Sequence, residues 1–73
     1  MNKYIIPICD IQGGHVWNVI IMARTRNECQ EKLMQSLIAQ YELFDDTLTY
    51  REFVEEADKK DILIGDIKDI EEL

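Results

Sequence analysis

The stretch IIPICDIQGGHVWNVIIMAR, residues 5–24, decides the fold. Two runs of apolar and β-branched residues flank Gly13-Gly14, and this arrangement predicts a β-hairpin. A two-residue type I′ turn needs positive φ at both central positions, which glycine supplies without steric cost. With this turn we expect Gln12 to face His15 and Tyr4 to face Ala23.

Side chains of a strand alternate between two faces of the sheet. One predicted face carries the paired positions Tyr4, Ile6, Ile8, Asp10, Gln12, His15, Trp17, Val19, Ile21 and Ala23. The other face carries Ile5, Pro7, Cys9, Ile11, Val16, Asn18, Ile20 and Met22. Both faces are rich in apolar residues, so the pattern alone does not say which face is buried.

A helix is predicted after the hairpin. Thr25 and Glu28 have the spacing of a capping box, in which threonine accepts from an amide of the first turn and glutamate reaches back to the cap. An apolar stripe at helical spacing continues to about Tyr41 and consists of Cys29, Leu33, Met34, Leu37, Ile38 and Tyr41.

A second capping box, Thr49 to Glu52, predicts another helix that ends near Lys59. Its apolar residues at i, i+3, i+4 and i+7 are Tyr50, Phe53, Val54 and Ala57. A short third strand, Ile62–Ile64, is then predicted between Asp61 and Gly65. Residues 66–73 fit either a strand or a helical turn.

Residues 1–73 therefore predict a single α+β domain of order ββααβ, with two antiparallel helices packed on the sheet. Counting chain reversals makes the third strand antiparallel to the second and parallel to the first. Pro7 has no amide hydrogen for a strand ladder, which favours the first strand at a sheet edge or turns that amide position away from a neighbour. If the first strand is at an edge, the third pairs with the second.

Two helices can cover one face of such a sheet and leave the other exposed. An exposed apolar patch usually marks an interface, so the predicted apolar contact residues are Ile5, Ile11, Val16, Trp17, Ile20 and Met22. Trp17 is the expected anchor if its face is uncovered. Two alternatives remain open at this point: one helix crosses each face, or a longer turn shifts the register by one residue.

The formal charge of −7 is unevenly distributed along the chain. Residues 1–41 hold three acids and four bases, whereas residues 42–73 hold twelve acids and four bases. Direct binding to nucleic acid is disfavoured because phosphate contacts require clustered Lys and Arg. A basic protein surface would be attracted instead.

Neither a cofactor, a metal nor an enzymatic activity is predicted. Cys9 and Cys29 are too few for a disulfide scaffold or a zinc pattern, and His15 is the only histidine. A calcium loop needs acids at alternate positions, whereas the segment DKKDILIGDIKD, residues 58–69, has isoleucines and leucine where ligands should be. The first apolar run is broken by Pro7 and Asp10, so neither a signal peptide nor a membrane span is expected, and we expect a cytoplasmic protein with reduced thiols.

Two functional hypotheses follow, and no family motif is recognised. The first is a small inhibitor, of the kind found in phages and mobile elements, whose carboxylates replace phosphates on a basic surface that otherwise holds nucleic acid. Its predicted contact residues are Asp45, Asp46, Glu52, Glu55, Glu56, Asp58, Asp66 and Asp69. The second is a homodimeric structural or regulatory module, antitoxin-like, joined through the uncovered sheet face. A solvated surface that only aids solubility is the simpler explanation of the acids.

Overall fold

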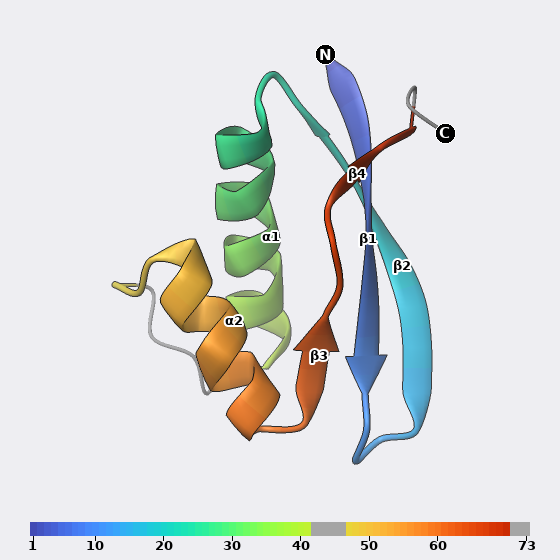
Figure 1. Ribbon diagram of the computed structural model, residues 1–73, viewed down its shortest axis with the longest axis vertical. Coiled ribbons are helices and arrows are strands. Elements are labelled where there is room, and N and C mark those ends of the chain that lie inside the picture. Colours follow the sequence, from blue (N-terminus) through green and yellow to red (C-terminus); the bar gives the residue numbers. More distant parts are fainter. Residues whose placement is uncertain (42–46, 71–73) are drawn as a thin grey trace.

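The computed structural model describes residues 1–41 and 47–70 of the chain. A four-stranded antiparallel sheet packs against two helices (Figure 1), which confirms the predicted α+β fold. The elements are β1 (Asn2–Asp10), β2 (His15–Ala23), α1 (Arg26–Gln40), α2 (Tyr50–Lys59), β3 (Ile62–Ile64) and β4 (Lys68–Asp69).

The hairpin turn is longer than predicted. Asp10 pairs with His15, so four residues, 11–14, form the turn instead of two. The Asp10 carboxylate accepts a hydrogen bond of 3.0 Å from the Gly13 amide, and Gly14 adopts the positive φ of 69° that glycine tolerates. The pairing therefore shifts by two residues, and Tyr4 faces Ile21 instead of Ala23. Because the shift is an even number, every strand side chain keeps its predicted face.

The strand order β2-β1-β3 corrects the predicted topology. β1 is the central strand, and β3 pairs antiparallel with β1 instead of lying beside β2. β4 continues along the same side of β1, with Lys68 opposite Ile5.

Pro7 lies in this central strand, and the sheet accommodates it by a break in the third strand. β3 ends at Ile64, opposite Ile8, and β4 begins at Lys68, so three residues, 65–67, span two residues of β1. The Gly65 amide donates to the Pro7 carbonyl at 2.8 Å. Pro7, which has no amide hydrogen to donate, thus lies opposite a bulge. Bulges, like edge strands, are positions where sheets tolerate proline.

Both helices have the predicted limits. Thr25 is the N-cap of α1 and accepts from the Glu28 amide, whereas Thr49 and Glu52 form a complete capping box on α2. The helices are not antiparallel, however: α2 is inclined to α1, and both descend toward the hairpin turn (Figure 1). The chain requires this because β3 begins beside Asp10, at the turn end of β1, so α2 must end there.

The core lies between both helices and one face of the sheet, which excludes the alternative that one helix crosses each face. Ile67, which lies in the break between β3 and β4, is buried. The short strand β4 shows that part of residues 66–73, which fit either a strand or a helical turn by sequence, is extended. The buried residues are Tyr4, Ile6, Ile8, Ile21, Ala23, Cys29, Leu33, Met34, Leu37, Phe53, Ala57, Ile62 and Ile67.

Candidate interaction surface

The face of the sheet opposite the helices is apolar and exposed. β2 contributes most of it, with Val16 exposed to 76%, Ile20 to 60% and Met22 to 49%. β1 adds the partly buried Ile5, and Ile11 is exposed in the hairpin turn. Five of the six predicted apolar contact residues are therefore at least partly accessible along this side of the sheet. We call the strand residues of this side the open face: Lys3, Ile5, Pro7, Cys9, Val16, Asn18, Ile20, Met22, Leu63 and Lys68.

Trp17, the sixth predicted contact residue, lies on the helix-covered side. It pairs with Ile8, not with Asp10, and is partly buried against the core. Tyr41 and Gln40 at the end of α1 line a hollow beside it. The condition for the anchor role, an uncovered face, is not met, so Trp17 does not belong to the open face.

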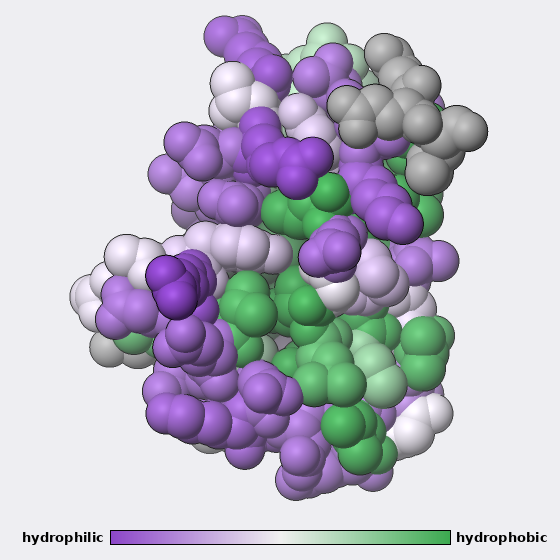
Figure 2. Space-filling view, in the orientation of Figure 1, coloured by the Kyte–Doolittle hydropathy of each residue, from purple (hydrophilic) through white to green (hydrophobic). Residues whose placement is uncertain are grey.

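Leu63 is an exposed residue that the sequence analysis missed. It pairs with Cys9, and strand alternation places both on the open face. The same alternation along Ile62–Ile64 could have identified it, since only the outer two residues of that strand face the helices. Apolar atoms gather over β3 and the lower part of the hairpin, whereas hydrophilic atoms cover most of α2 (Figure 2).

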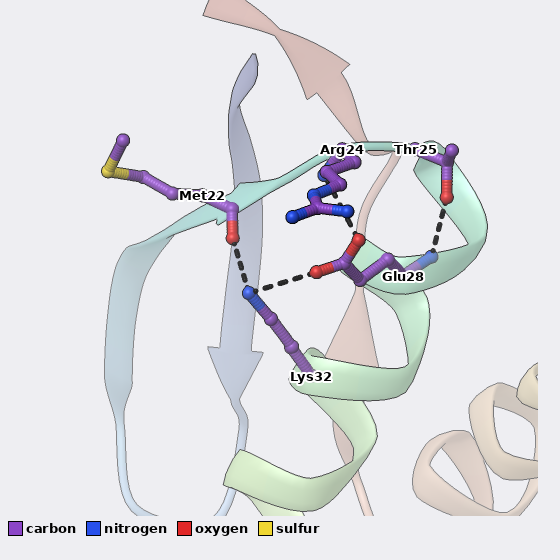
Figure 3. Close-up of polar contacts among 5 residues, drawn as sticks. All are labelled: Met22, Arg24, Thr25, Glu28 and Lys32. Atoms are coloured by element: carbon purple, nitrogen blue, oxygen red, sulfur yellow. Dashed lines mark hydrogen bonds and ion pairs between the residues drawn. The ribbon is translucent and has the colours of Figure 1, made fainter. Parts of the chain in front are cut away.

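The junction between β2 and α1 is held by a small polar network (Figure 3). Glu28 accepts a hydrogen bond of 3.2 Å from the Arg24 amide and forms an ion pair of 3.3 Å with Lys32. Lys32 Nζ also donates to the Met22 carbonyl at 2.8 Å, while the Met22 side chain points away from the helix. The Arg24 amide and the Lys32 ammonium lower the pKa of Glu28 below its usual value.

This network differs in one detail from the predicted capping box. Thr25 caps α1 as expected, but the Glu28 carboxylate bonds to the amide of Arg24 instead of the amide of Thr25 itself. The consequence is a tighter link between the last residues of β2 and the first turn of α1. It fixes the Met22 end of the β2 edge.

Six of the eight predicted acidic contact residues lie in described parts of the chain, and Asp45 and Asp46 lie outside the described residues. α2 carries Glu52, Glu55, Glu56 and Asp58; Asp66 precedes β4, and Asp69 is within it.

Several of these carboxylates already have partners. Glu52 accepts from the Thr49 amide and hydroxyl at 3.2 and 2.9 Å. Glu55 pairs with Arg51 at 3.7 Å, and Glu56 pairs with Lys59 at 3.2 Å. Part of the negative charge of α2 is compensated locally.

A hollow of about 650 Å³ lies between the hairpin turn and the end of α2. Its walls are Asp10, Gln12, Gly13, Tyr41, Lys59, Lys60 and Ile62. The Tyr41 hydroxyl donates to the Asp10 carboxylate at 3.4 Å, and burial together with this carboxylate raises the pKa of Tyr41. The phenol is protonated at neutral pH, so it acts there as a hydrogen-bond donor to Asp10.

The residues with catalytic or metal-binding chemistry lie apart from one another. Cys29 is buried in α1, and burial raises the pKa of its thiol, whereas Cys9 is on the open face. Within residues 1–41 and 47–70, no three His, Cys, Asp or Glu side chains are placed so that they could share a metal ion. None of the helices in the described ranges has the length and apolar character needed to cross a membrane.

Comparisons with protein families, with curated proteins and with solved structures find no match to this chain. Two surface features stand out in the described part of the chain, the open face and the acidic residues of the C-terminal half. The open face is the larger departure from an ordinary soluble surface, since exposed apolar residues are normally scattered singly.

Proposed function

We propose that this protein is a small, non-enzymatic interaction module that forms a homodimer through the open face and its β2 edge. The observation that carries the proposal is the exposure of Val16, Ile20 and Met22, three of the four outward positions of β2, with Leu63 exposed on the same face on the other side of β1. Fully burying one such side chain is worth about 1.5–3 kcal/mol, so covering several supplies a driving force for association.

The small size of the domain supports the same proposal. A chain of 73 residues buries only about 60% of the surface of its unfolded form, and an added subunit interface increases that fraction. A non-enzymatic role is supported by the separation of the reactive groups, with Cys29 in the core and His15 and Cys9 on opposite sides of the hairpin. A structural or regulatory role, as in small antitoxins, fits a module that works by association.

Size-exclusion chromatography with light scattering, over a concentration series from micromolar to near-millimolar, tests this proposal. We expect a dimer mass that Ile20→Lys reduces to the monomer mass, because the substitution places a charge in the centre of the apolar surface. Ser36→Lys on the exposed side of α1 is the matched control and should leave the dimer intact. A monomer at all concentrations would contradict the proposal.

A second candidate function is docking of the acidic half onto a basic protein surface, as a nucleic-acid mimic. The exposed side chains of Glu55, Asp58 and Asp66 favour it, since they present carboxylates from α2 and from the segment before β4. α1 packs over β2 and α2 over β3, so these acids lie away from the β2 edge, and both functions are compatible.

Affinity capture from a lysate at two salt concentrations tests this second function. We expect capture of a nucleic-acid-binding protein at low salt, its release at moderate salt, and competition by DNA. The double variant Glu55→Gln/Asp58→Asn should weaken binding, whereas Glu31→Gln on α1 serves as a control of equal charge change per site. A complex that is insensitive to salt would reject the acidic docking.

A further inference from the structure

On the basis of the self-association proposed above, we infer that two copies of this chain join by antiparallel pairing of their β2 strands. The two sheets then form one continuous sheet across a two-fold axis. The occupant of the β2 edge is thus a second β2 strand, and the open faces of both copies lie side by side on one surface.

The backbone of β2 is oriented for this pairing. The Pro7 carbonyl accepts from Gly65, and the Ile11 amide donates to Asp61, so odd-numbered residues of the first strand direct their backbone groups toward β3. Even-numbered residues of β1 consequently face β2, where they pair with odd-numbered residues such as Val19, opposite Ile6. The even-numbered residues of β2 must then direct their amides and carbonyls away from the sheet.

The bond from Lys32 Nζ to the Met22 carbonyl agrees with this orientation, because it reaches that oxygen from outside the hairpin. The outward-directed positions are Val16, Asn18, Ile20 and Met22. Their side chains all belong to the open face. In an antiparallel pair, residues directly opposite each other have side chains on the same side, so pairing of two β2 edges brings the apolar side chains of Val16 and Ile20 in the two copies together, on either side of Asn18.

β2 also lacks the devices that normally protect an edge strand. Natural edges are shielded by lysine, proline, inward-pointing charges, bulges or short strands. β2 runs for nine residues, His15–Ala23, without Lys, Arg, Asp, Glu, Pro or Gly. The opposite edge is interrupted between Ile64 and Lys68 and carries Asp66, Lys68 and Asp69. The two edges thus differ in both length and charge, and β2 is the edge suited to extension.

The distribution of charge permits a second copy at this edge. The chain carries a net charge of −7, which opposes self-association, but twelve of its fifteen acids lie in residues 42–73. Since α2 packs over β3, on the side away from β2, pairing through β2 keeps the acids of α2 in the two copies at the far ends of the joint sheet. Screening over about 8 Å at physiological salt then removes most of their repulsion.

The Lys32 contact indicates the register. If Asn18 lies opposite Asn18 of the second copy, Val16 lies opposite its Ile20, and these pairs exchange backbone hydrogen bonds. Met22, whose carbonyl is already bonded to Lys32, then lies beyond the paired segment. In this register the paired residues are Val16, Asn18 and Ile20 in the middle of the β2 edge, and the junction between β2 and α1 is unchanged.

Hydrogen exchange of the unmodified protein at low and high concentration tests the inference residue by residue. We expect the amides of Val16, Asn18 and Ile20 to gain at least tenfold protection at high concentration. The amides of Trp17, Val19 and Ile21 face β1 and should be protected at both concentrations, which makes them internal controls. Equal protection of the even-numbered amides at both concentrations, in a protein that dimerises, would overturn β2 pairing.

Asn18→Pro and Leu63→Ser provide the matched variants, read out as dimer dissociation constants. Asn18→Pro removes one outward amide hydrogen and no apolar side chain, so we expect at least tenfold weaker dimerisation. Leu63→Ser alters the open face away from the β2 edge, so it should change the dimer dissociation constant less than threefold. The reverse result indicates two sheets packed face to face, which overturns β2 pairing but retains the homodimer. A monomer at every concentration overturns both, and hydrogen exchange decides if Asn18→Pro does not fold.

Discussion

The two faces of the sheet are built from the same kinds of residues, but one face is buried and the other is exposed. Ile6 in β1 has no exposed surface, whereas Ile20 in β2 is exposed to 60%, although each is an isoleucine in the middle of a strand. The difference is the layer of helices on one side. Hydrophobicity thus decides which residues are available for burial, but cover by another element decides which of them form the core.

This contrast separates stability from association. The covered face packs against Phe53, Leu33 and Leu37, which are almost completely buried and supply the apolar area that stabilises the subunit. The open face supplies apolar side chains along β2 that a second chain would contact. Substitutions on the covered face should therefore change the free energy of unfolding, and most of those on the open face should change only the association.

The largest expected effect compares Ile6→Ala with Ile20→Ala. Ile6→Ala leaves a cavity in the core and should lower the free energy of unfolding by about 2–5 kcal/mol. Ile20→Ala should change it by about 0.5 kcal/mol or less when measured on the monomer at high dilution. Urea denaturation followed by circular dichroism gives both values. Similar losses for the two variants would show that the open face is covered within the subunit.

Gly65→Ala should be an exception to this comparison, because it changes a residue on the open side and should nevertheless lower the stability of the folded chain. A Cβ at this position would overlap with Pro7 Cγ and would lie 3.3 Å from the Pro7 carbonyl oxygen. The ring and the backbone of the central strand must shift, at a cost of about 1–3 kcal/mol. Thermal unfolding measures this cost, and Gly14→Ala, with nothing near the added Cβ but a φ of 69°, isolates the effect of backbone strain. An unchanged melting temperature in Gly65→Ala would contradict the close contact.

Thr49→Ala tests how much the N-cap of α2, one of the two helices on the covered face, contributes to the free energy of unfolding. The Thr49 hydroxyl accepts from the Glu52 amide at 3.3 Å, and loss of this N-cap should cost about 1 kcal/mol. Thr49→Ser retains the hydroxyl and should restore most of that value. Both are measured by urea denaturation. If alanine and serine have the same effect, the cap does not contribute to stability.

The smallest effect is expected from acid titration of Glu28. Its pKa is lowered in the folded chain, so the ionised carboxylate stabilises the fold above the ordinary value of 4.5. This contribution is lost as the pH falls below 4.5 and through the folded-state pKa. NMR titration of the Glu28 carboxyl and of the Arg24 amide should give the same lowered midpoint. In Glu28→Gln the acid-dependent step at the Arg24 amide should disappear.

Local signals predicted the local structure well. Thr25 and Thr49 begin the two helices, which end at Gln40 and Lys59, because caps and apolar stripes depend on neighbours within one or two turns. The hairpin turn was predicted two residues too short, since the Asp10 carboxylate competes for the Gly13 amide. The faces remained correct because a shift of two preserves alternation.

Long-range relations were predicted less well. Counting reversals made the third strand parallel to the first, whereas α2 runs the same general way as α1 and β3 is antiparallel to β1. Pro7 was expected at an edge, but the break at residues 65–67 accommodates it in the central strand.

The sequence by itself determined the hairpin, the two helices and the short third strand, the side of the sheet to which each hairpin residue belongs, and the concentration of acids in the C-terminal half, since these depend on spacing and composition. Only the tertiary structure decided that both helices cover the same side, that β1 is central, and that an uncharged β2 is left at the edge. The physical reason is that the alternation of side chains along a strand assigns each residue to one of two faces but does not indicate which face is buried. The packing of all the elements together chooses which face is buried.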